Sequence, residues 1–86
     1  MVLECIPSDL AKTISEKLTI PTIGIGAGVH CDGQVLVSYD MLGITTGKQT
    51  RFVRNFLSNQ ITISEAVESF VAEVKEGRFP SESESY

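Results

Sequence analysis

The chain has 86 residues, of which 42% are hydrophobic, and seven basic against eleven acidic side chains give it a formal net charge of −4. This length allows one small domain, which buries only about 60–65% of the surface that its unfolded chain exposes. The negative charge argues against binding to nucleic acid or to an anionic membrane, and the sequence has neither an apolar run of ~18 residues nor a signal peptide, so we expect a cytoplasmic protein.

Three short apolar runs in the first half of the chain predict strands of a parallel sheet. Val2-Leu3-Glu4 resembles the end of one strand, and residues 22–25 and 35–37 are brief, rich in β-branched side chains and bounded by glycine, proline or aspartate. Such runs are typical of strands that are buried on both faces. Apolar residues at positions 10, 14 and 18 recur every four residues and predict a helix over 8–18, with Ser8 as its N-cap.

The second half of the chain is predicted to be helical. Residues 46–49 have the pattern of a capping box and begin a helix whose apolar face carries positions 52, 53, 56 and 57. Residues 62–65 form a second box, and the helix that follows ends at Gly77. Residues 80–86 are polar and acidic and predict a flexible tail after a single domain of residues 1–79. These patterns favour an α/β fold with about three short parallel strands and three main helices.

Cysteine, aspartate and basic side chains do not define a site by their spacing. Cys5 and Cys31, with a single histidine, are too few for a structural zinc site, and both are expected to be reduced thiols. Asp32 belongs to an Asp-Gly turn pair and Asp40 follows a strand-like run, and we interpret both as turn and capping residues. The basic side chains between positions 48 and 54 are interpreted as the solvated face of a helix.

Glu4 is the strongest single candidate for chemistry. It follows a Val-Leu strand directly, and the carboxyl ends of parallel strands are where barrels and other α/β folds place their reacting groups. A partly desolvated glutamate there can act as a base that removes a proton next to a carbonyl group. The alternative from pattern alone is a structural role, in which Glu4 caps a backbone amide or pairs with a lysine.

A second candidate is the glycine-rich exit of the 22–25 strand. Gly24, Gly26 and Gly28 do not form the dinucleotide-binding fingerprint, because Val29 stands where its third glycine would be. Glycines at a strand exit allow positive φ and a close approach of the backbone. Gly26, Ala27 and Gly28 are therefore either substrate-binding residues or a sharp turn without further function, and the pattern favours neither.

The order and spacing of several motifs resemble the C-terminal part of the ketopantoate hydroxymethyltransferase family, also called 3-methyl-2-oxobutanoate hydroxymethyltransferases. The resemblance extends over essentially the whole chain. Its motifs are Val2-Leu3-Glu4-Cys5-Ile6-Pro7, residues 20–28, Asp32-Gly33-Gln34-Val35-Leu36-Val37, Asp40-Met41-Leu42-Gly43, Asn55-Phe56 and residues 73–80.

The resemblance implies a fold and a reaction. The family is a (β/α)8 TIM barrel of the phosphoenolpyruvate/pyruvate type that forms homo-oligomers and acts in pantothenate biosynthesis. It transfers a hydroxymethyl group from 5,10-methylenetetrahydrofolate to 3-methyl-2-oxobutanoate, a small keto acid, with Mg2+ as cofactor. In the family, the glutamate of the matching Leu-Glu-Cys-x-Pro segment is the proton acceptor, a role that the resemblance gives to Glu4.

The length of the chain departs from the family pattern. A barrel of this type needs ~250 residues, so the family's Mg2+ ligands would lie upstream of this chain, and we expect the chain alone to bind neither Mg2+ nor folate and to be inactive. Two hypotheses follow. The chain is part of a truncated or split enzyme that needs the missing barrel segment, or it is a non-catalytic module that self-associates through its open strand edges.

Overall fold

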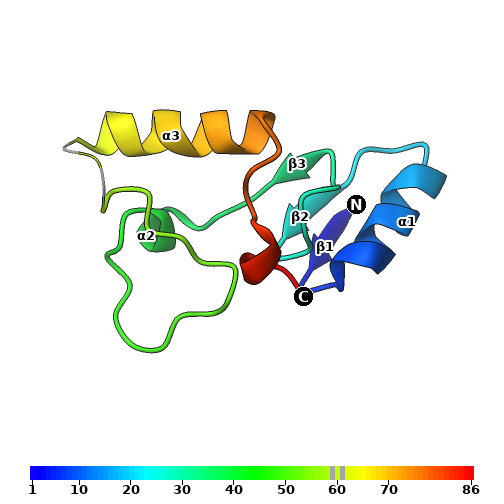
Figure 1. Cartoon of the computed structure of the whole chain (residues 1–86), viewed down its shortest axis with the longest axis horizontal. Coiled ribbons are helices and arrows are strands. Elements are labelled where there is room, and N and C mark those ends of the chain that lie inside the picture. Colours follow the sequence, from blue (N-terminus) through cyan, green and yellow to red (C-terminus); the bar gives the residue numbers. More distant parts are fainter. Residues whose placement is uncertain (59, 61) are drawn as a thin grey trace.

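The computed structural model describes residues 1–58, 60 and 62–86, and they form an α/β unit (Figure 1). The elements follow one another as β1 (Val2–Glu4), α1 (Ser8–Lys17), β2 (Ile23–Ile25), β3 (Gly33–Gln34), α2 (Ser38–Met41), α3 (Ile63–Lys75) and the 3-10 helix η1 (Glu82–Glu84). The expected α/β class with three parallel strands is confirmed. There are three α-helices among the described residues, but one of them, α2, was not predicted from the sequence. Among the helices of the described residues, none has the length and apolar character needed to cross a membrane.

The sheet has the order β1-β2-β3, and both strand pairs are parallel. Leu3 of β1 is buried in a cluster with Ala11 of α1 and Ala27, so α1 covers one face of the sheet. Val2 and Ile23 are neighbours in register and are exposed. Because successive side chains of a strand point to opposite faces, the second face of the sheet is open to solvent in this chain.

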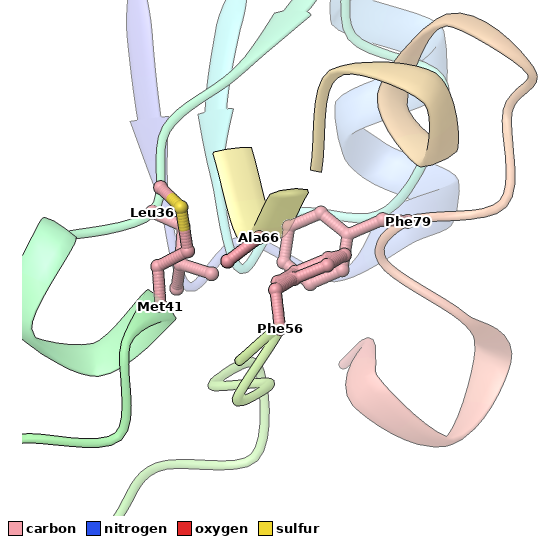
Figure 2. Packing of buried hydrophobic residues seen from close by; sticks show 5 residues of the cluster. All are labelled: Leu36, Met41, Phe56, Ala66 and Phe79. Carbon is pink, nitrogen blue, oxygen red and sulfur yellow. The ribbon is translucent and has the colours of Figure 1, made fainter. Parts of the chain in front are cut away.

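A second hydrophobic cluster lies beyond the sheet, between α2, α3 and the segment that joins them (Figure 2). The Phe56 ring packs edge-on against Phe70 and Phe79, with ring centroids 5.5 and 5.4 Å away. Aromatic rings favour such edge-to-face contacts. The buried members of the cluster are Leu36, Met41, Phe56, Ala66 and Phe79.

The prediction of a helix that begins at Thr46 is wrong. Residues 46–57 are all described, and they contain turns but no helix. A helix would place Phe52 and Phe56 on one face, because they are four residues apart. Instead the Phe52 ring lies against Gly26 and the Phe56 ring lies in the second cluster. Burial of the two rings at separate places overrides the local capping pattern.

Other boundaries differ in smaller ways. The third strand is Gly33–Gln34 and not residues 35–37, although the Val35 N–H still donates to the Gly24 carbonyl at 2.9 Å. Ser8 is the first residue of α1, with Pro7 at the N-cap position. The capping box of Thr62 and Glu65 is confirmed at the start of α3, and Gly77 follows that helix with a φ of +72°.

Residues 80–86, which the sequence predicts to be a flexible tail, have a defined conformation with specific contacts. They contain η1, Glu84 forms an ion pair with Arg54 at 2.7 Å, and the Tyr86 carbonyl accepts a hydrogen bond from the Ser8 N–H at 3.2 Å. Charge-assisted hydrogen bonds of this kind are stronger than those between neutral groups. The mobility of the tail stays a prediction.

Candidate active site at the carboxyl ends of the strands

Glu4 is the last residue of β1 and lies at the carboxyl edge of the sheet, in register with Ile25 of β2. Its side chain is exposed. Among the described residues, no hydrogen bond or ion pair engages the Glu4 carboxylate, so nothing there supports the alternative role as a cap or ion-pair partner. The position is that of a reacting group in a parallel α/β fold.

The residue after Glu4 has an unusual backbone. Cys5 has a φ of +53°, and its N–H donates to the Ile25 carbonyl at 2.9 Å. A left-handed conformation is uncommon outside glycine and asparagine, and such strain gathers at functional sites. The bond to Ile25 fixes the turn of the chain directly after Glu4. Sequence reasoning missed this feature, because a cysteine carries no signal for positive φ.

The glycines after β2 come to the same edge of the sheet as Glu4, but protein atoms cover them. A Cβ atom on Gly26 would lie 2.3 Å from the Phe52 ring, and one on Gly28 would lie 2.4 Å from the Ser8 Cβ atom. Both glycines have positive φ, and Ala27 between them is fully buried. The residue type is thus explained by a tight turn and close packing. A role of Gly26, Ala27 and Gly28 in substrate binding stays a prediction.

Gln34 of β3 is a further polar residue at this turn that the sequence did not single out. Its amide Nε2 donates to the Gly28 carbonyl at 2.9 Å and so holds the turn. Its Oε1 atom is buried without a hydrogen-bond partner among the described residues. A Cβ atom on Gly24 would lie 3.1 Å from this oxygen, so the glycine leaves room for the amide.

The two aspartates considered as candidates do not join Glu4. Asp32 accepts hydrogen bonds at Oδ2 from the N–H and the hydroxyl of Thr22, at 2.8 and 3.2 Å, next to the amino end of β2. Asp40 lies within α2. In the described part of the chain, no group of three histidine, cysteine, aspartate or glutamate side chains is placed to hold a metal ion. Asp32 therefore has the structural role expected of a turn residue, and Cys5 and Cys31 are free thiols.

A pocket of about 290 Å3 lies beside this edge of the sheet, and Glu4 does not line it. Its size is at the lower limit for small-molecule sites. The pocket is formed by the start of α1, the turn after β2 and the tail, with the residues Ser8, Asp9, Val29, His30, Pro80, Glu82 and Ser85. The candidate base is thus exposed on an open edge and not enclosed by a cavity of this chain.

Comparison with known proteins identifies the family. A family model described as ketopantoate hydroxymethyltransferase matches residues 1–82. The chain belongs to the ketopantoate hydroxymethyltransferase family. It is 59% identical over all of its 86 residues to the 3-methyl-2-oxobutanoate hydroxymethyltransferase of Ruthia magnifica and 57% identical to that of Buchnera aphidicola. It is 50% identical to a probable enzyme of the same name from Schizosaccharomyces pombe.

The chain spans about a third of the length of these hydroxymethyltransferases, 33% for the first two and 32% for the third. The resemblance inferred from the sequence motifs is thereby confirmed, and so is the expectation that the chain corresponds to a fragment of the longer enzymes. Three parallel strands with their helices are consistent with one part of a barrel.

Proposed function

We propose that this chain supplies one part of a ketopantoate hydroxymethyltransferase and contributes the proton acceptor, Glu4, to its reaction. The observation that carries the proposal is the place of Glu4: an exposed carboxylate at the carboxyl end of β1, followed by a backbone turn that is fixed by hydrogen bonding to β2. Membership of the family supports the reaction type. We propose a cytoplasmic location, as expected for a biosynthetic enzyme of this type.

In the proposed reaction, Glu4 removes a proton from the carbon next to the keto group of 3-methyl-2-oxobutanoate. The C–H bond breaks, its electron pair forms the new C–C bond to the methylene carbon of 5,10-methylenetetrahydrofolate, and Glu4 takes the proton. Both C–N bonds of that carbon break and water supplies the hydroxyl group of the product. The two nitrogens of the released tetrahydrofolate receive the proton from Glu4 and the remaining hydrogen of the water. The product is 2-dehydropantoate. A carboxylate suits this step because it can accept a proton. Its place at an open strand end lets a substrate approach it along the sheet edge.

The described residues do not fit a magnesium site, because no three carboxylate, histidine or cysteine side chains converge among them. We therefore assign no step through Mg2+ to this chain. We propose instead that Mg2+ and the folate bind to the part of the enzyme that the longer relatives have in addition, and that the chain alone is inactive.

Complementation tests this proposal. The purified 86-residue chain is assayed for 2-dehydropantoate with both substrates and Mg2+, alone and after mixing with the remaining two thirds of the Ruthia magnifica relative. We expect product only from the mixture, and we expect Glu4→Gln to lower its kcat by at least 100-fold, in the range of general-base catalysis. Glu16→Gln is the matched control, since Glu16 is exposed on α1. Turnover by the isolated chain, or full activity of the Glu4→Gln mixture, would contradict the proposal.

A second candidate function is a non-catalytic module that associates with copies of itself. The exposed apolar side chains on the open sheet face, among them Val2, Ile23 and Val35, favour it, as do the two edge strands β1 and β3. Mass measurement in solution distinguishes the two. A stable homo-oligomer that gives no activity with the complementing segment supports the module, and a monomer that gains activity supports the split enzyme.

A further inference from the structure

The two hydrophobic clusters belong to different stretches of the chain. The first joins Leu3, Ala11 and Ala27, and the second gathers its buried residues between positions 36 and 79. The elements that carry them lie toward opposite ends of the long axis, β1 and α1 toward one end and α2 and α3 toward the other, in a molecule that measures 40 × 25 × 19 Å (Figure 1). The last six residues of the tail, 81–86, contact both halves, so these contacts show how one half is held against the other.

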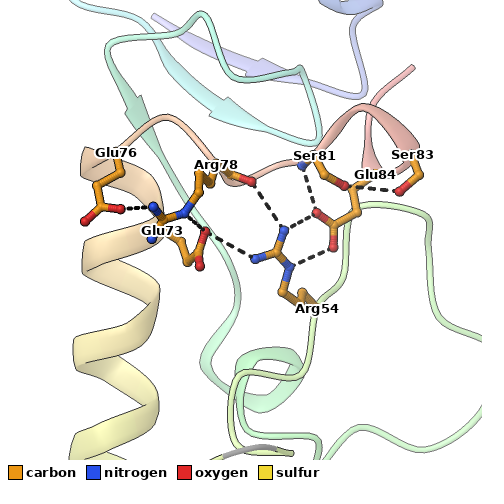
Figure 3. Close-up of polar contacts among 7 residues, drawn as sticks. All are labelled: Arg54, Glu73, Glu76, Arg78, Ser81, Ser83 and Glu84. Carbon is orange, nitrogen blue, oxygen red and sulfur yellow. Dashed lines mark hydrogen bonds and ion pairs between the residues drawn. The ribbon is translucent and has the colours of Figure 1, made fainter.

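Arg54 anchors the tail to the second half (Figure 3). Its guanidinium donates from Nε and Nη2 to the two carboxylate oxygens of Glu84, at 2.9 and 2.7 Å, and from Nη2 to the Arg78 carbonyl at 3.4 Å. The same group lies over the rings of Phe56 and Phe79, 5.2 and 5.0 Å from their centroids. The two rings are in contact with each other, 5.4 Å apart, and the guanidinium lies beside both of them. A planar fork that pairs with a carboxylate and also packs on aromatic rings suits arginine better than lysine.

Glu84 is held from both sides. Only 16% of its side chain is exposed, and 29% of that of Arg54. Burial by itself opposes ionisation of Glu84, but the hydrogen bonds from Arg54 and Ser81 outweigh it, so the pKa of the Glu84 carboxyl lies below its ordinary value. The Ser81 N–H donates to Glu84 at 2.8 Å and so forms the turn of η1. The ion pair and the turn therefore stabilise each other.

The other end of the tail meets the start of α1, in the first half. The Ser8 N–H and hydroxyl both donate to the Tyr86 carbonyl, each at 3.2 Å. Arg51 donates to the Ser85 carbonyl at 3.1 Å, and its guanidinium lies 4.8 Å from the centre of the Tyr86 ring. Ser8 is four residues after Glu4, so these bonds end at the connection that leaves the candidate base.

We propose that residues 81–86 form a clasp, locked by Arg54 at Glu84 and closed by Ser8 at Tyr86, that positions the connection between β1 and α1. Arg54 is then a positioning residue that acts on the Glu4 end of the sheet from the other half of the molecule. The consequence for catalysis rests on the proposed function, whereas the clasp itself does not, because it is defined by contacts within the chain.

Hydrogen exchange of the backbone amides of residues 5–11, apart from Pro7, which has no N–H, tests the clasp in the full chain without any measurement of activity. We expect Glu84→Gln, which keeps the size of the side chain, to speed this exchange about tenfold, as expected when one charge-assisted contact is lost. Arg54→Ala should act at least as strongly, and Arg54→Lys less, because lysine keeps the charge without the fork. Arg78→Ala is the matched control, since the Arg78 side chain pairs with Glu73 and Glu76 at the end of α3.

The outcomes are distinct. Faster exchange at 5–11 in Glu84→Gln but not in Arg78→Ala supports the clasp, and unchanged exchange at 5–11 in Glu84→Gln overturns it. If Arg54→Ala unfolds the whole chain, Glu84→Gln and Ser8→Ala still decide the question. In the complemented enzyme, Glu84→Gln should lower kcat several-fold with little change in KM. If exchange in Glu84→Gln is unchanged and the complemented enzyme is active, the clasp is contradicted and the proposed function is not. If exchange in Glu84→Gln is faster but the complemented natural chain gives no product, the proposed function is contradicted and the clasp is not.

Discussion

Gly26 is a residue at which the two halves of the chain are in close contact. Its φ of +67° is in the left-handed region, and the Phe52 ring occupies the place of a Cβ atom. Both constraints exclude a side chain for separate reasons, one of backbone strain and one of space. Gly26 therefore fixes the direction of the chain after β2 and also provides the surface on which Phe52 is buried.

Gly26→Ala should destabilise the fold by about 2–4 kcal/mol, because the cost of a left-handed alanine adds to that of displacing a packed ring. The measurement is urea unfolding followed by circular dichroism. Gly33→Ala is the matched control, since a Cβ atom there meets only the Ile23 side chain at 3.9 Å, and we expect a change within about 0.5 kcal/mol. Equal stability of the two variants would show that Phe52 does not pack against Gly26 in solution.

At the scale of elements, α3 is the helix whose beginning is best defined by local chemistry. The Thr62 hydroxyl accepts from the Glu65 N–H at 3.2 Å, and the Glu65 carboxylate accepts from the Thr62 N–H at 3.0 Å. Thr62→Ala removes the first of these bonds and should cost about 1 kcal/mol of stability. Ser64→Ala, exposed within the same turn, should be neutral or slightly stabilising. Calorimetric melting of both variants checks the prediction, which fails if they melt alike.

Local signals predicted the elements that depend on local contacts. The capping box of Thr62 and Glu65 and the apolar runs at β1 and β2 both led to elements that the structure contains. The box at Thr46 did not, because the burial of Phe52 and Phe56 at two separate places is a tertiary effect that no window of sequence contains. For the same reason the sequence indicated Glu4 by its place after a strand, but not the left-handed Cys5 beside it or the contacts of Gln34.

At the scale of the whole molecule, the tail joins two halves that each have a small hydrophobic cluster. A chain of 86 residues with two separate clusters has little buried surface in each. Neither cluster joins the two halves by itself. The tail does so through charged and polar groups, at Arg54 in one half and at Ser8 in the other. Arg54, interpreted from the sequence as part of a solvated face, is instead the centre of this network. Polar networks of this kind respond to pH, whereas apolar clusters do not.

The clasp should open in acid. The pKa of Glu84 is below its ordinary value of about 4.5 in the folded chain and returns to that value on unfolding, so the folded state binds fewer protons there than the unfolded state does. The stability that Glu84 contributes is therefore complete above about pH 5 and is lost as the pH falls through the lowered pKa. Exchange at residues 5–11, corrected for the intrinsic rate at each pH, should be as slow at pH 5 as at pH 7 and accelerate as the pH falls through the lowered pKa of Glu84.

In Glu84→Gln this acceleration should disappear, because the side chain no longer titrates, and exchange should already be fast at neutral pH. Glu82→Gln is the matched control, since Glu82 is an exposed residue of the same 3-10 turn, and it should keep the acid response of the natural chain. If exchange in Glu84→Gln still accelerates in acid, another carboxylate causes the response, and titration of Glu84 does not open the clasp. A response that disappears in Glu84→Gln alone would make one partly buried ion pair the link between solution pH and the strand end that carries Glu4.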